Sequence, residues 1–410
     1  MTLADVVPAV TTRALDQLAS DAELAAPHEL AGLIDRCGRA LGAETTTAYV
    51  TDLQQHVLQP LLPPGAHLAN EQLAALDVDA TLAGRAYQTL LPQQQDEEGG
   101  TRAWLPLVSG TQRLGVLSVR LPNPPDEEAL GSLTRLAAAA ATLLVAKTPY
   151  GDTIVRLRRR DHLGVASELH YSILPPLSYA SGAVTVSAAL EPCYEVAGDA
   201  IDYSVDPGRT QVAVFDGMGH GLHSAQCAVF TVAAYRSARR SALGLADVMR
   251  SIDEALVTGL GGELFTTCVL ADLDTDSGRL TWVNAGHPYP LLLRGGKVIK
   301  TLETEPRPPL GLGELVEEPH VVGQEQLEPG DIVLLYTDGV VEARSPDGEF
   351  FGVDRLGDLV CTQLAGGLSA PETMRRAVRE LLAHHQGQLT DDATLLMLEW
   401  RRPPDPVGQE

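Results

Sequence analysis

The chain has 410 residues, of which 44 % are hydrophobic, and a formal net charge of −24. A chain of this length is expected to fold as two or three domains with ordinary globular cores. Its acidity argues against general affinity for nucleic acids or anionic membranes, because phosphates are bound mainly through Lys and Arg.

Targeting and cysteine patterns indicate a cytoplasmic protein. Residues 1–21 are not predicted to be a signal peptide, because Asp5 and Asp16 interrupt them and no basic segment leads into an apolar core. No apolar run reaches the roughly 18 residues of a membrane helix, so no membrane span is predicted. The five cysteines lack CxxC spacing, which predicts reduced, buried thiols.

Residues 1–26 are predicted to be an N-terminal tail, and residues 27–147 to form the first domain. The expected elements of this domain are a helix, a strand, an acidic loop, two strands joined by a turn and an alanine-rich helix: 30–41, 45–52, 93–101, 104–108, 114–119 and 127–146. This order, and especially the strand Leu114-Gly115-Val116-Leu117-Ser118-Val119 before the last helix, resembles a GAF sensor domain. The resemblance implies a small α/β sensor, and a different small α/β domain is the alternative.

Residues 148–178 are predicted to link the domains through a helix over 153–177. Its apolar side chains recur at three- and four-residue spacing on one face: Leu163, Ala166, Leu169 and Ile173. Pro175-Pro176 ends the helix, because proline has no backbone N–H to donate. A solvated linker is one interpretation. The apolar face favours a helix that packs on the next domain or on a second copy, so that the linker and the last sensor helix form a homodimer.

Residues 179–400 are predicted to form the second domain, followed by a C-terminal tail over 401–410. The expected strands are 184–190, 211–215, 265–273, 279–284, 289–294, 332–336 and 394–400. The expected helices are 224–238, 246–259, 354–363 and 371–384. Hairpin-like strand spacing with clustered helices predicts an α+β fold with antiparallel sheets rather than a doubly wound parallel sheet.

Four acidic positions mark this second domain. Asp216 and Asp338 each follow an apolar, strand-like run and precede a glycine; the other two positions are Gly198-Asp199 and Asp391-Asp392. A single Asp-Gly pair is usually a turn. Four such positions in order, beside strand-like runs, predict instead that folding brings the carboxylates together around divalent cations, which prefer oxygen ligands.

This donor set predicts a metal-dependent phosphohydrolase. Two divalent ions about 4 Å apart lower the pKa of a bridging water and neutralise phosphoryl oxygens. No side-chain nucleophile is then required, and the sequence contains no Gly-x-Ser-x-Gly elbow. The stretch Gly217-Met218-Gly219 does not complete the GxGxxG pattern of a dinucleotide site.

Six ordered motifs carry a family resemblance: Ser172-Ile173-Leu174-Pro175-Pro176, Val196-Ala197-Gly198-Asp199, Asp216-Gly217-Met218-Gly219-His220-Gly221, Asn284-Ala285-Gly286-His287-Pro288, Tyr336-Thr337-Asp338-Gly339 with Glu342, and Asp391-Asp392-Ala393-Thr394. From about residue 174 to residue 400, the chain resembles the bacterial PPM, or protein phosphatase 2C-like (PP2C-like), serine/threonine phosphatases. The branch is that of stage II sporulation protein E and the stress-response phosphatases. The fold implied is an α-β-β-α sandwich of two antiparallel sheets flanked by helices, with metals at one edge.

The resemblance implies two Mn²⁺ or Mg²⁺ ions and assigns their ligands. Asp199, Asp216 and the Gly217 carbonyl would hold one ion. Asp216 would bridge to the second, which Asp338 and Asp391 would complete. Asp216 and Asp338 are therefore the candidate catalytic residues.

Two further carboxylates are expected beside the metals without binding them. Asp392 is the first, although spacing leaves an exchange of roles with Asp391 open. Asp202 is the second. The proton source for the leaving group also stays open, because Met218 stands where other branches have a histidine; His220 is either that acid or a cap or surface residue.

The combined interpretation is a cytoplasmic, metal-dependent protein serine/threonine phosphatase controlled by an N-terminal sensor domain. By resemblance, its substrate would be a phosphorylated anti-anti-sigma-factor-like protein, with neither nucleic acid nor membrane as partner. His287 is interpreted as a structural turn residue. The alternatives are a small-molecule phosphohydrolase with the same metal chemistry and a non-catalytic partner-binding module.

Overall fold

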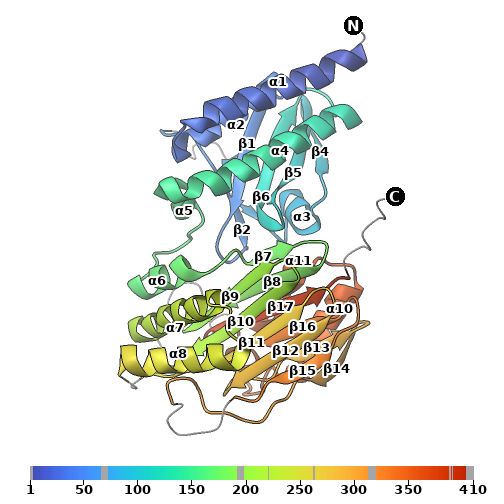
Figure 1. Cartoon of the computed structure of the whole chain (residues 1–410). Helices are drawn as coiled ribbons and strands as arrows, with labels where there is room; N and C mark the ends of the chain where they lie inside the picture. The colour runs from blue at the N-terminus through green and yellow to red at the C-terminus, as the bar shows by residue number, and fades with distance from the viewer. Residues whose placement is uncertain are drawn as a thin grey trace, which may run out of the picture. The chain divides into compact units, whose positions relative to one another are not determined.

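Three antiparallel sheets organise the described part of the chain (Figure 1). The computed structural model describes residues 3–65, 73–191, 198–219, 221–261, 264–312, 320–386, 389 and 391–402. The chain divides into two compact units, Met1–Asp161 and His162–Glu410.

The first unit contains a six-stranded sheet in the order β3-β2-β1-β6-β5-β4. Its strands are β1 (Thr45–Thr51), β2 (Val57–Pro60), β3 (Leu76–Asp77), β4 (Gln93–Glu97), β5 (Gly100–Ser109) and β6 (Gln112–Leu121). Its helices are α1 (Leu3–Glu23), α2 (Leu30–Ala40), α3 (Leu82–Thr89), α4 (Glu127–Lys147) and α5 (Asp152–Leu157), with short 3₁₀ turns η1 (Pro27–Glu29) and η3 (Thr148–Tyr150).

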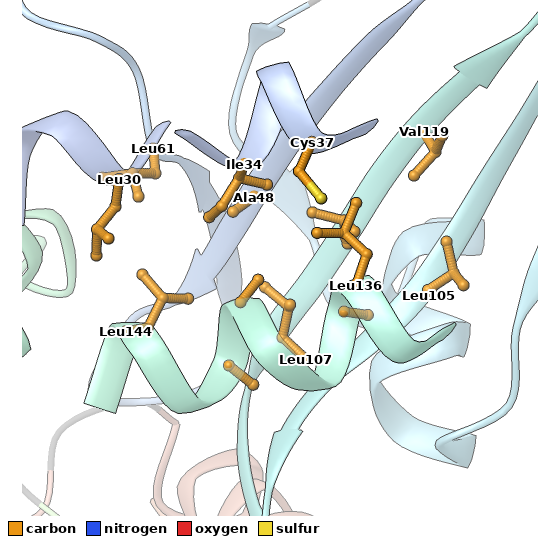
Figure 2. Packing of buried hydrophobic residues seen from close by; sticks show 14 of the residues in the cluster. Leu30, Ile34, Cys37, Ala48, Leu61, Leu105, Leu107, Val119, Leu136 and Leu144 are labelled. Atoms are coloured by element: carbon orange, nitrogen blue, oxygen red, sulfur yellow. The ribbon is translucent and has the colours of Figure 1, made fainter. Parts of the chain in front are cut away.

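Both faces of this sheet are buried, because helices cover each of them. On one face, side chains from α1, α2 and α4 pack against β1, β5 and β6; Figure 2 shows Ile34 and Cys37 of α2 with Leu136 and Leu144 of α4 in this cluster. On the other face, α3 packs on a second cluster that includes Tyr49. The alternation of side chains along each strand therefore supplies two cores from one sheet.

The predicted N-terminal tail is wrong, because residues 3–23 form α1. Ala14, Leu18 and Ala22 recur every four residues and lie in the same core as α2 and α4. The predicted acidic loop over 93–101 is also largely strand. In β4, Glu97 forms an ion pair with Arg102 of the neighbouring strand, and this pairing offsets the acidic composition. The GAF identity of the unit stays a prediction.

Residues Glu127–Tyr150 are long and apolar enough to cross a membrane by length and composition. The lengths of the apolar runs in the sequence did not predict a helix that meets these criteria for a membrane span. Leu133, Leu136 and Leu144 of this stretch lie in the core of the first unit, which accounts for its apolar composition.

The predicted linker helix over 153–177 is divided into two helices. α5 belongs to the first unit, where Ile154 is buried, and α6 (Val165–Ile173) belongs to the second. The carbonyl of Arg158 accepts a hydrogen bond from the backbone N–H of Leu53, and Gly164 caps the start of α6. These two features, the bond from Leu53 and the Gly164 cap, interrupt a helix that side-chain spacing alone predicts to be continuous.

The second unit contains two sheets, in the orders β15-β12-β11-β10-β9 and β14-β13-β16-β17-β8-β7. The strands are β7 (Ser178–Ala180), β8 (Val184–Glu191), β9 (Asp199–Asp206), β10 (Arg209–Gly217), β11 (Thr266–Asp274), β12 (Arg279–Ala285), β13 (Leu291–Arg294), β14 (Lys297–Thr301), β15 (Gly323–Gln326), β16 (Ile332–Tyr336) and β17 (Ala393–Trp400). The helices after α6 are α7 (Leu222–Arg240), α8 (Leu245–Leu260), α9 (Asp338–Val341), α10 (Val353–Ala365) and α11 (Ala370–His385).

Side chains of both sheets share one core cluster, to which Val212 and Val214 of β10 and Leu396 of β17 contribute. The opposite face of β10, with Phe215, packs on α7 and α8. Met374 of α11 lies in a further cluster with α10, β13, β16 and β17. The predicted α+β class with antiparallel sheets is confirmed.

Candidate metal centre

In the β15-β12-β11-β10-β9 sheet of the second unit, two neighbouring strands carry aspartates directly opposite each other. β9 begins at Asp199, β10 ends at Gly217, and Asp199 pairs with Asp216 in the register of the two strands. Asp199 lies on the same face of β9 as Ile201, and Asp216 on the same face of β10 as Val214, which both belong to the core between the sheets. Both carboxylates therefore lie at the edge of that core.

The other sheet of the second unit, which contains β16 and β17, brings two more acidic segments to one place. Asp338 is the first residue of α9, directly after β16 and Thr337, while Asp391 and Asp392 directly precede β17. β16 and β17 pair side by side, and the backbone N–H of Thr337 donates to the carbonyl of Thr394 at 3.1 Å. Two distant parts of the chain thus end at the same edge.

Hydrogen bonds join the acidic ends of the two sheets. The hydroxyl of Thr337 donates to Oδ2 of Asp199 at 2.7 Å and accepts from the backbone N–H of Thr394 at 3.0 Å. Oδ2 of Asp392 accepts from the backbone N–H groups of Gly198 at 2.6 Å and Asp199 at 3.3 Å. The four predicted acidic positions are therefore brought together.

Asp216 lies in a strongly negative environment. Burial raises its pKa to about 7, and repulsion adds to the shift. The repelling carboxylates are those of Asp338, Asp391 and Asp392. A carboxylate with this environment gains from a nearby cation more than an exposed one does.

The neighbouring carboxylates show the same effect. Burial, followed by repulsion from Asp392 and Asp216, raises the pKa of Asp199 well above its ordinary value. Burial also raises the pKa of Asp392 to about 7, although two backbone N–H groups oppose the shift. For Asp391, burial again raises the pKa. Within the described ranges, no Lys or Arg is among the causes of these shifts, so no basic side chain there offsets the charge of the cluster.

The donor set fits a hard divalent cation, although the carboxylates are not gathered into a complete coordination sphere. Within the described ranges, no group of three or more His, Cys, Asp or Glu side chains is arranged to hold a metal ion. Oδ1 of Asp392 is buried and has no hydrogen-bond partner among the residues that the structure describes, and carboxylate oxygens are the ligands that Mg²⁺ and Mn²⁺ prefer. Gly339 lets these segments meet, because a Cβ atom there would lie 1.9 Å from the carbonyl oxygen of Asp392.

Asp202 does not lie beside the other carboxylates as predicted. It occupies the opposite face of β9 from Asp199, because residues three apart in a strand point to opposite faces. Its carboxylate forms ion pairs with Arg236 at 2.8 Å and Arg239 at 3.3 Å, both on α7. Asp202 is therefore a structural residue between β9 and α7.

Sequence reasoning missed the hydroxyl groups that contact the carboxylates. Thr337 belongs to the motif Tyr336-Thr337-Asp338-Gly339, and its place next to Asp338 is the signal that could have revealed it. Thr267 has no motif, but it lies opposite Asp216 on β11. His220 lies outside the described residues, so its role as acid or cap stays a prediction.

Comparison with known proteins identifies the second unit. Residues 206–401 match the family model of stage II sporulation protein E (SpoIIE). This part of the chain belongs to the SpoIIE family of PP2C-like phosphatases. Asp199 lies shortly before the matched residues, and the whole first unit also precedes them.

Curated relatives agree with this SpoIIE-family assignment. The phosphoserine phosphatase RsbU of Bacillus subtilis is 24 % identical over 240 residues, which are 58 % of this chain and 70 % of RsbU. The phosphoserine phosphatase RsbP of the same organism is 27 % identical, over 50 % of this chain and 49 % of RsbP. Among solved structures, the SiaA-PP2C domain of Pseudomonas aeruginosa is 20 % identical with a TM-score of 0.48, over 57 % of this chain and 94 % of that domain. The chain thus spans only about half of RsbP.

Proposed function

We propose that this protein is a divalent-metal-dependent protein serine/threonine phosphatase. The observation that carries the proposal is the convergence of Asp199, Asp216, Asp338 and the Asp391-Asp392 pair at one edge of two sheets. Burial, with repulsion between the carboxylates, raises the pKa values of Asp199, Asp216, Asp391 and Asp392, and within the described part of the chain no Lys or Arg contributes to these shifts. The names of RsbU and RsbP as phosphoserine phosphatases support the substrate class.

Two Mn²⁺ or Mg²⁺ ions would be held by the predicted ligands. Asp199, Asp216 and the Gly217 carbonyl would bind one, and Asp216, Asp338 and Asp391 the other. When bound, the ions would supply positive charge to the phosphoryl group of the substrate. We infer that the layers of the second unit form the α-β-β-α sandwich, and these ligands would lie at its edge.

The residues of this chain have separate tasks in the proposed reaction. Asp216 and Asp338 would contribute the negative charge that fixes the metals next to the phosphoryl group. Asp392 would hold the backbone of Gly198 and Asp199 in place, because its Oδ2 already accepts both N–H groups. This contact favours Asp391, which is more exposed, as the residue that binds metal directly.

We further propose that the first unit is a GAF-like sensor and that α6 passes its state to the phosphatase. Within the second unit, Arg236 donates to the carbonyl of Ile173 at the end of α6 at 2.6 Å and also pairs with Asp202 of β9. Because β9 begins at Asp199, a displacement of α6 would reach a proposed metal ligand. Substituting Leu169 and Ile173 should change regulation or dimerisation, whereas unchanged activity and assembly would contradict this role.

The proposed substrate is a cytoplasmic phosphoprotein of the anti-anti-sigma-factor type, and the protein would act as a homodimer. The test uses the full chain with manganese and two substrates: an aryl phosphate and phosphoserine peptides. Hydrolysis of the peptides supports a protein phosphatase. Hydrolysis of aryl phosphate and small phosphates alone would indicate a small-molecule enzyme, and a folded protein that binds no manganese would overturn the proposal.

A further inference from the structure

The turn after β12 contains a buried histidine that the proposed function does not use. Two hydrogen bonds between Asn284 and His287 close this turn. The side-chain amide of Asn284 donates to the backbone carbonyl of His287 at 2.8 Å, and the backbone N–H of His287 donates to the side-chain oxygen of Asn284 at 2.9 Å. Gly286 between them has a φ of +68°, which favours glycine. The turn holds the imidazole of His287, a residue that is only 5 % exposed, in a fixed place.

The imidazole contacts a threonine that faces Asp216. Nδ1 of His287 lies 2.8 Å from Oγ1 of Thr267, and Thr267 is paired with Asp216 in the register of β10 and β11. The same hydroxyl lies 3.5 Å from Oδ2 of Asp216, a long hydrogen bond. His287, Thr267 and Asp216 therefore form a continuous chain of polar contacts that begins at a rigid turn.

The number of available hydrogens determines which group donates and which accepts along the contacts His287–Thr267–Asp216. A threonine hydroxyl has one hydrogen, so Thr267 can donate to Asp216 only if it accepts from an N–H at Nδ1 of His287. Among the described residues, Nε2 of His287 is buried with no partner at hydrogen-bonding distance, although the Tyr336 carbonyl favours a proton on the ring. The contact of Nδ1 with Thr267 at 2.8 Å is a full hydrogen bond, and an unsatisfied lone pair at Nε2 costs less than an unsatisfied N–H. Burial lowers the pKa of His287 to about 3, against a smaller opposing effect of the Tyr336 carbonyl, so the ring is neutral.

We propose that His287 is a positioning residue, protonated at Nδ1, that acts through Thr267 to orient the carboxylate of Asp216 for metal binding. The inference rests on the proposed function, because Asp216 is there the ligand shared by both ions. It assigns the Asn284-His287 motif a task beyond forming a turn.

Matched variants separate positioning from a structural role. His287→Asn places an amide N–H near the position of Nδ1, whereas His287→Gln places its amide nearer to Nε2. Thr267→Ser keeps the hydroxyl and Thr267→Val removes it. We expect His287→Gln and Thr267→Val to weaken manganese affinity by about 10-fold or more, as is typical when a group that orients a metal ligand is lost. The Asn and Ser variants should bind within a few-fold of wild type.

Manganese affinity is measured by isothermal titration calorimetry on the full chain, and thermal unfolding of the metal-free variants checks their folding. Lower unfolding temperatures with unchanged manganese affinity would show a structural role only and overturn the inference. Wild-type protein that binds no manganese would overturn the proposed function as well, so the two failures are distinguishable.

A second measurement does not depend on any variant being folded. ¹⁵N NMR of the metal-free wild-type protein reports which imidazole nitrogen of His287 carries the proton. A proton at Nδ1 supports the inference. A proton at Nε2 would turn the Thr267 hydroxyl toward the ring and away from Asp216, which would overturn it.

Discussion

The two faces of β9 carry carboxylates that are equally buried but have opposite surroundings. Asp199 and Asp202 are each 2 % exposed. Asp202 forms ion pairs with two arginines of α7, whereas burial and then repulsion from Asp392 and Asp216 raise the pKa of Asp199. Burial of a charge therefore does not by itself mark a functional site; the sign of the neighbouring charges separates a structural ion pair from a centre that lacks a cation.

The largest expected effect comes from substituting Asp216, the aspartate that the other carboxylates of the cluster repel. Asp216→Asn should lower phosphatase activity by at least about 100-fold, because the shared ligand loses its charge. The metal-free variant should be as stable as wild type or more stable, since the substitution removes a buried, repelled carboxylate. Steady-state kinetics and urea unfolding measure the two quantities, and normal turnover would contradict the proposed mechanism.

Substituting each carboxylate of β9 tests the comparison directly. Asp202→Asn should reduce the free energy of unfolding by about 2–3 kcal/mol, less than a fully buried pair because Arg236 is partly exposed. Asp199→Asn should leave the metal-free stability unchanged or higher while weakening manganese binding. Equal losses of stability in the two variants, measured by urea unfolding without metal, would show that the two faces are not distinct.

A buried histidine in α6 extends the comparison to a titratable group that is not matched by an opposite charge. Burial lowers the pKa of His170 from 6.5 to about 4, and its Nδ1 has no hydrogen-bond partner in the described ranges of the chain. The unfolded chain binds a proton below about pH 6.5 and the folded chain only near pH 4, so stability is lost as the pH falls through this window.

His170→Phe should remove this pH dependence. Relative to the variant, wild type should lose about 3 kcal/mol of unfolding free energy between pH 7 and pH 4. Urea unfolding at the two pH values gives the difference, and the aspartate cluster cancels because both proteins contain it. Parallel pH profiles for the two proteins would show that His170 does not titrate in this way.

The sequence predicted the ends of the strands better than the faces of the residues near them. Asp216 and Asp338 stand next to long apolar runs, so both the strands and the acidic positions after them could be identified. Asp202 was expected beside the metals, but the alternation of side chains in β9 places it on the opposite face from Asp199. The contact of Thr337 with Asp199 depends on the pairing of two sheets, which local sequence does not determine.

Other elements lacked the pattern on which prediction depends. β14 has every residue exposed, so it shows no apolar alternation and was missed. α1 was interpreted as a tail because its small buried residues, such as Ala14 and Ala22, give a weak apolar signal. The linker helix was overextended because the hydrogen bonds of Arg158 are made to a distant part of the first unit.

The smallest expected effect concerns the hydroxyl that joins the two sheets at Asp199. Thr337→Val should weaken manganese affinity by about 10-fold, because Oδ2 of Asp199 loses the bond that orients it. Thr337→Ser keeps the hydroxyl and should bind manganese nearly as well as wild type, which makes it the matched control. Calorimetric titration distinguishes the variants. If the Val and Ser variants bind equally, the orientation of Asp199 comes from its backbone alone, and the difference between the two faces of β9 rests on charge rather than on hydrogen bonding.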